Sequence, residues 1–277
     1  MTATPNPSDW IGHTESCADN MDAGHAERVA LAVDRAAPEA GDALPPLWHW
    51  AFFVTAQPYA RLGADGHPQR GEFLPPAENR NRMWAGGRVE FRRPLTIGTP
   101  ARRVSTIAKV VEKTGRTGKL LFVTVRHDYT QAGAACIREE QDIVYREPSP
   151  PKLGGGEPAP ASQWSETVTP SSVMLFRYSA VTFNGHRIHY DYPYAHDTEG
   201  YPNLVVHGPL IATLMIGAFT RAHPGKTIHK IAYRGLRPLI APTPFQVAGT
   251  IESPGAALAW AAQGGTLAHR AEIGFGE

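Results

Sequence analysis

The chain has 277 residues, a formal net charge of +1 and a hydrophobic content of 42%. This length allows one large domain or two of ordinary size, and the apolar content is enough for a normal core. The near-zero charge gives no electrostatic sign of a nucleic-acid or membrane partner, and we expect neither. Cys17 and Cys136 lie far apart and form no CxxC pair, which argues against a disulfide scaffold and a zinc ribbon.

The N-terminal residues carry no recognisable targeting signal. They lack the basic start and apolar run of a signal peptide. Acidic residues such as Asp9, Glu15 and Asp19 precede the first basic residue, Arg28, whereas a mitochondrial transit peptide is rich in arginine and poor in acids. No apolar run reaches membrane-spanning length. We therefore expect a cytoplasmic protein.

The first 81 residues predict an arm, a buried aromatic segment and a long loop. Residues 8–35 read as a helical arm, with these inward residues: Trp10, Ile11, Val29, Leu31 and Val33. The segment W-H-W-A-F-F-V at 48–54 is either a strand or a short buried helix, and its periodicity does not decide between them. Residues 58–81 hold several prolines and glycines and predict a long irregular loop, a kind that is often functional in compact domains.

From Gly87 onward, apolar and polar residues alternate with the period of a β-strand. Val89 and Phe91 alternate with charged residues, and residues 121–126 continue the pattern. The turn T-G-R-T-G-K at 114–119 predicts a hairpin connection, and residues 136–145 give another strand. Four more strands are predicted near the C-terminus, at 228–234, 245–251, 256–262 and 266–273. Gly264 and Gly265 form a two-residue hairpin signal between the last two.

A segment rich in proline and glycine, residues 148–161, has the composition of a linker. It predicts an N-terminal unit at 1–147 and a C-terminal unit at 162–277. The motif R-P-L-x-x-x-T-P occurs once in each, starting at Arg93 and at Arg237, and both copies lie between predicted strands. We interpret this as a duplication of one α+β unit, a long helix against an antiparallel sheet, which is the hotdog arrangement.

An apolar segment after His207 predicts a buried helix. Residues 209–219 are apolar on all sides, and they are too few to span a bilayer. Pro209 suits the first helical position, so the helix should begin at Gly208, whose N–H would be free. A free N–H at a buried helix N-terminus favours developing negative charge, as an oxyanion hole for a thioester or amide carbonyl requires.

A polar run, N-G-H-R-I-H-Y-D, precedes this helix and begins at Asn184. Histidine is the usual general acid or base near neutral pH. Asn184 and His189 flank the tight position at Gly185, so both are expected to face one cleft. A carboxamide beside a histidine can hold a water molecule for addition to, or loss from, a double bond. Asp191 is interpreted as a turn or capping residue.

The two segments together resemble the hydratase motif of the MaoC-like R-specific enoyl-CoA hydratases and 3-hydroxyacyl-thioester dehydratases. That motif reads roughly Y-x-x-S-G-D-x-N-P-x-H and is followed by a helix that opens with H-G. In this alignment His189 takes the family histidine and Gly208 the family oxyanion glycine. Asn184 stands where the family usually has its catalytic Asp, and His186 where it usually has Asn.

One subgroup is especially similar, through F-N-x-H-R-I-H-Y-D and through R-M-W-A-G-G at 82–87: the mesaconyl-CoA or itaconyl-CoA hydratases and the mitochondrial-type 3-hydroxyacyl-thioester dehydratases. The resemblance implies an α+β double hotdog and a hydro-lyase acting on a CoA or ACP thioester, without a cofactor, and forming a homo-oligomer such as a dimer. The first half has no copy of the polar run, so it is expected to supply packing surface and part of the acyl pocket.

The resemblance also implies roles. His189 would be the acid/base, Asn184 would orient the water, and the Gly208 N–H would meet the thioester oxygen. Three further residues are expected to contact the substrate: Tyr178, His186 and His207. Arg82 and Arg88, with Arg80, either recognise a carboxylate on the acyl chain or the CoA phosphates, or they are solvated surface residues.

Other functions remain open from the sequence. The first alternative is a fatty-acid-type 3-hydroxyacyl-thioester dehydratase. Others are a hotdog thioesterase, which would release free CoA without consuming the enoyl group, and a non-catalytic acyl-CoA-binding protein. A metal site using His186, His189 and His207 is disfavoured, because H-x-x-H here lacks the carboxylate of H-E-x-x-H and has no cysteine ligands.

Overall fold

The computed structural model describes residues 6–77, 80–115 and 118–277. The first half contains 3-10 helix η1 (Pro7–Trp10), strand β1 (Thr14–Asp19), helix α1 (Ala23–Ala32), 3-10 helices η2 (Trp48–Ala51) and η3 (Tyr59–Arg61), and strands β2 (Asn81–Phe91), β3 (Ala101–Gly115), β4 (Gly118–Gln131) and β5 (Ala134–Arg146). The second half contains β6 (Trp164–Val168), α2 (Ser172–Val181), 3-10 helix η4 (Arg187–His189), π-helix η5 (Tyr194–Thr198), α3 (Gly208–Ala222), β7 (Thr227–Gly235), β8 (Phe245–Ser253), β9 (Ala256–Gln263) and β10 (Thr266–Gly276).

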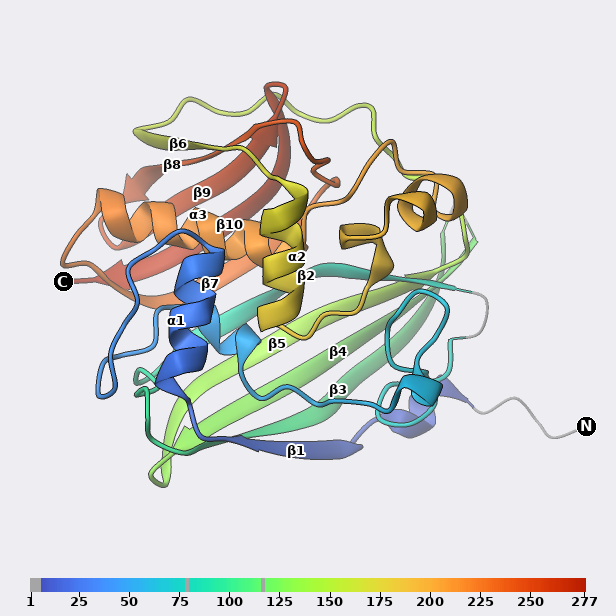
Figure 1. Cartoon of the computed structure of the whole chain (residues 1–277), viewed down its shortest axis with the longest axis horizontal. Coiled ribbons are helices and arrows are strands. Elements are labelled where there is room, and N and C mark those ends of the chain that lie inside the picture. Colours follow the sequence, from blue (N-terminus) through green and yellow to red (C-terminus); the bar gives the residue numbers. More distant parts are fainter. Residues whose placement is uncertain (1–5, 78–79, 116–117) are drawn as a thin grey trace, which may run out of the picture.

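The strands form a single ten-stranded sheet in the order β1-β3-β4-β5-β2-β7-β10-β9-β8-β6, as Figure 1 shows. Every neighbouring pair is antiparallel. Read outward from the centre, the two halves have the same strand order, with β2 matching β7 and β1 matching β6. This symmetry, with a helix packed on the sheet, confirms the predicted α+β double hotdog.

The repeated motif occupies equivalent places in the two halves. In the first half, the Gln131 side chain donates to the Thr96 and Thr99 carbonyls and accepts from the Thr96 N–H. In the second half, Gln263 makes the same three bonds to Ile240 and Thr243. A common ancestor for the two units explains why the motif recurs together with a glutamine that makes the same three hydrogen bonds to it. Residues 148–161 run between β5 and β6, and the domain division there stays a prediction.

Most predicted strands are present. β4 buries every second residue along most of its length, as its period-two pattern predicts, and the hairpin between β9 and β10 turns on Gly264 and Gly265, both with positive φ. Arg116 and Thr117, in the predicted turn between β3 and β4, lie outside the described residues. The aromatic segment at 48–54 begins with a short helix, η2, and contains no strand.

Two sequence predictions about the first half were wrong. The expected helical arm contains a strand, β1, whose residues pair with β3, and its helical residues are confined to the short η1 and to α1. Ile11 and Leu31, expected to point inward, are 50% and 52% exposed. The described residues of the first half also contain no long central helix: between α1 and β2 they form only the short 3-10 helices η2 and η3, whereas the second half has α3 directly before β7.

Helix α3 is the central helix of the second half and packs on β6, β8, β9 and β10 (Figure 1). Nine of its fifteen residues are buried, including Leu210, Ile211 and Phe219, as the apolar sequence predicts. It begins at Gly208, with Pro209 in its first turn. Burial on nearly all sides fixes the helix, and with it the position of its N-terminus. Among the described helices, none combines the length and apolar character needed to cross a membrane.

The two halves are joined at β2 and β7, from Gly86 paired with Arg234 to Glu90 paired with Lys230. Two adjacent glycines permit this junction. A Cβ on Gly86 would lie 2.4 Å from the Tyr233 carbonyl oxygen, and one on Gly87 would lie 2.4 Å from the Tyr233 hydroxyl. The glycine pair of R-M-W-A-G-G therefore has a structural reason: a side chain on Gly86 would strike the backbone of β7, and one on Gly87 would strike the Tyr233 ring and the Glu140 carbonyl of β5.

A buried carboxylate organises the wall of aromatic residues beside this junction. Glu139 is fully buried and accepts hydrogen bonds from Trp50 Nε1 (2.8 Å) and Tyr129 Oη (3.1 Å), and it pairs with His49 Nε2 (3.0 Å). Burial alone would raise the pKa of Glu139, but its hydrogen bond and charge interaction with His49 outweigh burial and lower the pKa to about 2. The carboxylate therefore stays ionised inside the protein.

Replacing Glu139 with alanine should destabilise the fold by about 3–5 kcal/mol, because His49, Trp50 and Tyr129 would lose a buried partner. The matched control is Glu140→Ala, which removes only an exposed ion pair with Arg88 and should cost at most about 1 kcal/mol. Urea unfolding of both variants measures the difference. Equal losses would contradict this role for Glu139.

The same carboxylate predicts an acid sensitivity of the fold. Since the folded pKa lies below the ordinary 4.5, its contribution to stability is complete above that pH and is lost as the pH falls toward about 2. Unfolding free energies measured across this range should fall more steeply in the wild type than in Glu139→Ala.

Candidate active site

A cavity of about 1120 Å³ opens between the two halves and is lined by residues of both. The second half contributes Asn184, His186, His189 and the start of α3 at Gly208. The first half contributes the loop around Asp65, the aromatic wall and the first residues of β2, from Asn81 to Trp84. The structure therefore brings the three residues predicted to be catalytic to one cavity.

His189 is held rigidly at the cavity wall by the backbone that follows it. Its Nδ1 lies 2.7 Å from the Val205 carbonyl oxygen, and Val205 in turn donates its N–H to the Ile188 carbonyl. A carbonyl oxygen only accepts, so Nδ1 carries the proton and Nε2 of the neutral ring has a free lone pair. The side chain is 7% exposed. This is the tautomer that a general base needs.

The buried histidines are neutral near pH 7. Burial lowers the pKa of His189 to about 4, against the opposing effect of its bond to Val205. Burial also lowers the pKa of His186 and of His207, and neighbouring histidine charges lower both further. A proton placed on any of these rings would be costly in the resting site, so the rings are neutral at rest.

His207 lies behind His189 and does not line the cavity. The two rings stack with centroids 3.7 Å apart, and His207 Nε2 is 2.8 Å from the Ser179 hydroxyl. The predicted substrate contact for His207 was therefore wrong: this fully buried ring supports His189 instead. Tyr178 packs edge-on against His207. Both Tyr178 and His186 line the cavity.

Asn184 and Asp191 differ in role. The Asn184 Oδ1 accepts the His186 N–H at 3.0 Å, which shapes the loop and leaves its amide nitrogen without a partner among the described residues. Asp191 accepts two bonds from Arg187 and one from the Tyr194 N–H. Its structural interpretation is supported by these bonds, since its carboxylate holds the turn between η4 and η5.

The start of α3 is covered by a tryptophan from the first half. A Cβ on Gly208 would lie 2.5 Å from the Trp84 ring, and Trp84 itself stacks on Tyr233 with centroids 4.6 Å apart. The described residues offer no hydrogen-bond acceptor to the Gly208 N–H. Glycine is therefore required here, and its free N–H at a helix N-terminus is suited to a developing anion.

A loop of the first half crosses the polar run, and sequence reasoning missed its residues. Gly66 and Gly185 approach so closely that a Cβ on either would strike the other's carbonyl oxygen. The Arg187 N–H donates to the Asp65 carbonyl at 2.9 Å, which ties the two loops together. The sequence D-G-H-P at 65–68, within the predicted long loop, was the only sign of these residues. It did not indicate that the loop would contact the polar run.

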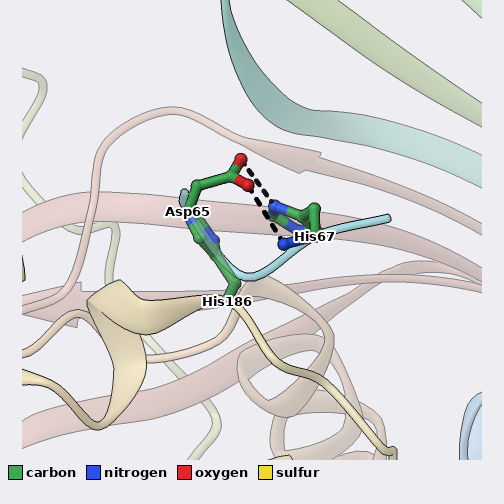
Figure 2. A group of neighbouring side chains, drawn as sticks. All are labelled: Asp65, His67 and His186. Carbon is green, nitrogen blue, oxygen red and sulfur yellow. Dashed lines mark hydrogen bonds and ion pairs between the residues drawn. The ribbon is translucent and has the colours of Figure 1, made fainter. Parts of the chain in front are cut away.

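This loop carries an Asp–His pair, shown in Figure 2. The Asp65 carboxylate accepts from His67 Nδ1 at 3.1 Å and from the His67 N–H at 3.0 Å. The His67 ring lies against His186, with centroids 4.2 Å apart, and His186 meets His189 edge-on at 5.3 Å. Ligand atoms of Asp65, His67 and His186 lie within 4.8 Å of one another, a composition able to bind a metal ion.

The pair is negatively charged overall. Burial would raise the pKa of Asp65, but hydrogen bonds from the His67 ring and backbone hold it below its usual range. Burial lowers the pKa of His67, and the positive charge of Arg82 lowers it further against the effect of Asp65. An ionised Asp65 beside a neutral His67 is the resulting state near pH 7.

The two arginines of the prediction have different positions. Arg82 lines the cavity, and its guanidinium has no hydrogen bond or ion pair within the described parts of the chain. Arg88 does not reach the cavity, because its guanidinium is bound by Glu140 (2.6 Å) and Asp142 (2.7 Å). The structure therefore contradicts the predicted substrate contact of Arg88. Arg80 is ion-paired with Glu112 at 2.6 Å.

Gly208→Ala should lower both stability and activity, because the added methyl group overlaps the Trp84 ring; overpacking of this kind costs about 1–3 kcal/mol. Trp84→Leu in the same chain should restore part of the stability. Gly217→Ala, in the same helix, meets only the flexible end of Arg221 and should be neutral or stabilising by up to about 1 kcal/mol. Thermal unfolding and a double-mutant cycle measure these effects; additive changes in the pair would contradict the contact.

Comparisons with known proteins identify the family of the chain. A sequence model of the family described as hydroxyacyl-thioester dehydratase type 2 matches residues 47–241. The mesaconyl-C(4)-CoA hydratase of Chloroflexus aurantiacus is 46% identical over 248 residues, covering 86% of each chain. The mitochondrial hydroxyacyl-thioester dehydratase type 2 of Schizosaccharomyces pombe is 30% identical over 232 residues, covering 74% of this chain and 77% of the relative.

A solved structure supports the fold. The MaoC-like dehydratase from Phytophthora capsici superposes with a TM-score of 0.73 at 14% identity, covering 98% of both chains. The family match confirms the predicted relationship and the predicted enzyme class, a hydro-lyase. On the match of most of the chain to the family and on these identities, the chain belongs to the hydroxyacyl-thioester dehydratase type 2 family.

Proposed function

We propose that this enzyme catalyses the reversible hydration of a short 2-enoyl-CoA that carries a second carboxylate, such as mesaconyl-CoA or itaconyl-CoA. The observation that carries the proposal is the orientation of His189, whose free Nε2 lone pair is fixed at the wall of the cavity that also receives the free Gly208 N–H. A base and an anion-binding N–H in one cavity are the two groups that this reaction requires.

The roles follow from the chemistry of addition to an enoyl thioester. His189 Nε2 takes a proton from water as the water oxygen bonds to C3. The electrons of the double bond move toward the thioester oxygen, where the Gly208 N–H stabilises the enolate. The imidazolium then returns its proton to C2, so no other reactant is needed. Asn184 cannot exchange a proton near neutral pH, and it would orient the water through its free amide nitrogen.

Arg82 supports a substrate with a distal carboxylate. It is a cavity-lining cation without a partner among the described residues, and a guanidinium binds a carboxylate through two parallel hydrogen bonds. The Chloroflexus relative carries a name that specifies mesaconyl-C(4)-CoA. Together these observations favour a dicarboxylic acyl group over a simple fatty-acyl chain.

A second candidate is the dehydration of a 3-hydroxyacyl thioester of fatty-acid type. The family model and the Schizosaccharomyces relative favour it, since both are described as hydroxyacyl-thioester dehydratases. The residues of the site would act in the same way in the reverse direction. A thioesterase would instead release free CoA without loss of enoyl absorbance, and a binding protein would do neither.

We further propose that the carrier is CoA or ACP, that the enzyme works as a dimer, and that it is cytoplasmic. Both cysteines are free, as a reducing compartment would keep them. Sedimentation of the purified enzyme tests the dimer.

His189→Ala should lower kcat by about 100- to 10,000-fold with the fold intact, because a positioned acid/base typically contributes that factor. Asn184→Ala should also lower the rate, and Asn184→Asp should be tolerated better. His196→Ala is the control, an exposed histidine that does not line the cavity. Full activity in a folded His189→Ala variant, with loss in His186→Ala, would move the acid/base role to His186.

The pH profile provides a separate test of the same residue. His189 acts as a base only when neutral, and its pKa is lowered to about 4, so kcat/KM should fall only as the pH approaches that value. A fall centred near the ordinary histidine pKa of about 6.5 would contradict the buried, neutral base.

Arg82→Ala should lower kcat/KM for mesaconyl-CoA by about 10- to 100-fold, the effect of a lost charge-assisted hydrogen bond, and should leave crotonyl-CoA little changed. Arg88→Ala, the neighbouring arginine outside the cavity, should change neither. Equal or better turnover of crotonyl-CoA, unaffected by Arg82→Ala, would favour the fatty-acid-type dehydratase.

A further inference from the structure

The loop of the first half that carries Asp65 and His67 is built against the polar run of the second half. Its backbone meets Gly185 at a distance that excludes any side chain on Gly66, and Arg187 binds it through its backbone N–H and through Nη1 to the Ala64 carbonyl at 3.0 Å. Contacts of this kind fix the loop in place. The Asp–His pair is therefore a permanent part of the cavity wall.

The proposed hydration leaves one electrostatic requirement unmet by the polar run itself. When His189 takes the proton from water, a positive charge forms in a buried site that already contains Arg82 and three other imidazoles. Burial lowers the pKa of His189, so this charge is disfavoured in the resting protein. Asn184 is neutral and His207 is neutral, so neither balances the charge. A preorganised anion near this point would lower the barrier.

Asp65 is the carboxylate connected to this row of histidines. It is hydrogen-bonded to His67, His67 lies on His186, and His186 meets His189 edge-on. The other carboxylates that line the cavity, Glu15 and Glu199, are bound elsewhere: Glu15 by Arg103, and Glu199 by Asn81 and Tyr194. The anion that the catalytic half lacks is thus present in the first half.

We propose that the Asp65–His67 pair is a positioning unit supplied by the first half, in which Asp65, acting through His67, stabilises the imidazolium that forms on His189 during proton transfer. The inference rests on the proposed function. The pair orders His186 against His189 and provides the countercharge across the interface of the two units. The first half is then required for the chemical step and for more than packing.

The alternative is that Asp65, His67 and His186 bind a metal ion, and two observations disfavour it. Metal-bound imidazoles point their nitrogens at the ion, whereas the His67 and His186 rings lie against each other, at an interplanar angle of 40°. Arg82 also lowers the pKa of both rings by its positive charge, after burial, which means that a cation lies near them already. A second, divalent cation would be repelled.

The test compares Asp65→Asn with Asp197→Asn in the full-length enzyme, assayed on mesaconyl-CoA. The Asp65→Asn change keeps an acceptor for the His67 N–H, removes the charge and replaces the oxygen that faces His67 Nδ1 with an amide nitrogen. Asp197 forms the same kind of pair with His196, at 2.7 Å, on the surface. We expect kcat to fall about tenfold or more in Asp65→Asn and His67→Gln with KM little changed, because a countercharge acts in the transition state. Asp197→Asn should match the wild type.

A second measurement separates a charge effect from a structural one. Asn184→Asp places a carboxylate beside the same histidines from the other side, so it should restore part of kcat in Asp65→Asn, and Asp65→Glu should retain most of it. Absence of rescue, or a rise in KM without a fall in kcat, would overturn the proposal. Loss of a stoichiometric metal ion together with activity would overturn it in favour of a metal site.

The outcomes also distinguish this inference from the proposed function. If the wild type hydrates the enoyl-CoA and His189→Ala does not, but Asp65→Asn is fully active, only the role of the pair fails. If the wild type has no hydratase or dehydratase activity, the proposed function fails first.

Discussion

The antiparallel pairing of β2 with β7 determines how the two halves of the chain meet. Gly86 and Gly87 allow it, because the Tyr233 backbone and ring occupy the space where their side chains would be. Since side chains alternate between the faces of a strand, a slip of one residue would turn Trp84 away from Gly208. The register of β2 on β7 therefore positions the N-terminus of α3 in one unit against Trp84 in the other.

The two units share a strand order but differ in the helices and loops that they contribute. The second unit has the long buried helix and the polar run, and the described residues of the first have only the short helices η2 and η3 between α1 and β2. The chain as described has one copy of the polar run, facing a cavity to which both units contribute.

Much of this could be predicted from the sequence. The buried helix from Gly208, the C-terminal strands and the repeated R-P-L-x-x-x-T-P motif follow from local patterns, which depend on neighbouring residues. His189 and Asn184 were singled out because they lie in one short run, and both line the cavity. What failed needed distant contacts: β1 forms because β3 is beside it, and Arg88 is bound by two carboxylates on β5. Asp65 and His67 were missed because their partner, His186, is more than a hundred residues away.

The aromatic wall has a consequence for how substrate preference can change over time. Trp50 faces the cavity and is held by the same buried carboxylate that binds His49 and Tyr129. Trp50 also packs edge-on against Trp84, which covers the start of α3. Enlarging the cavity by replacing Trp50 would leave the buried Glu139 carboxylate without one of its donors, and replacing Trp84 would uncover the helix N-terminus. Evolution toward longer acyl chains is therefore coupled to the thermodynamic stability of the first unit, and compensating substitutions around Glu139 would have to come before it.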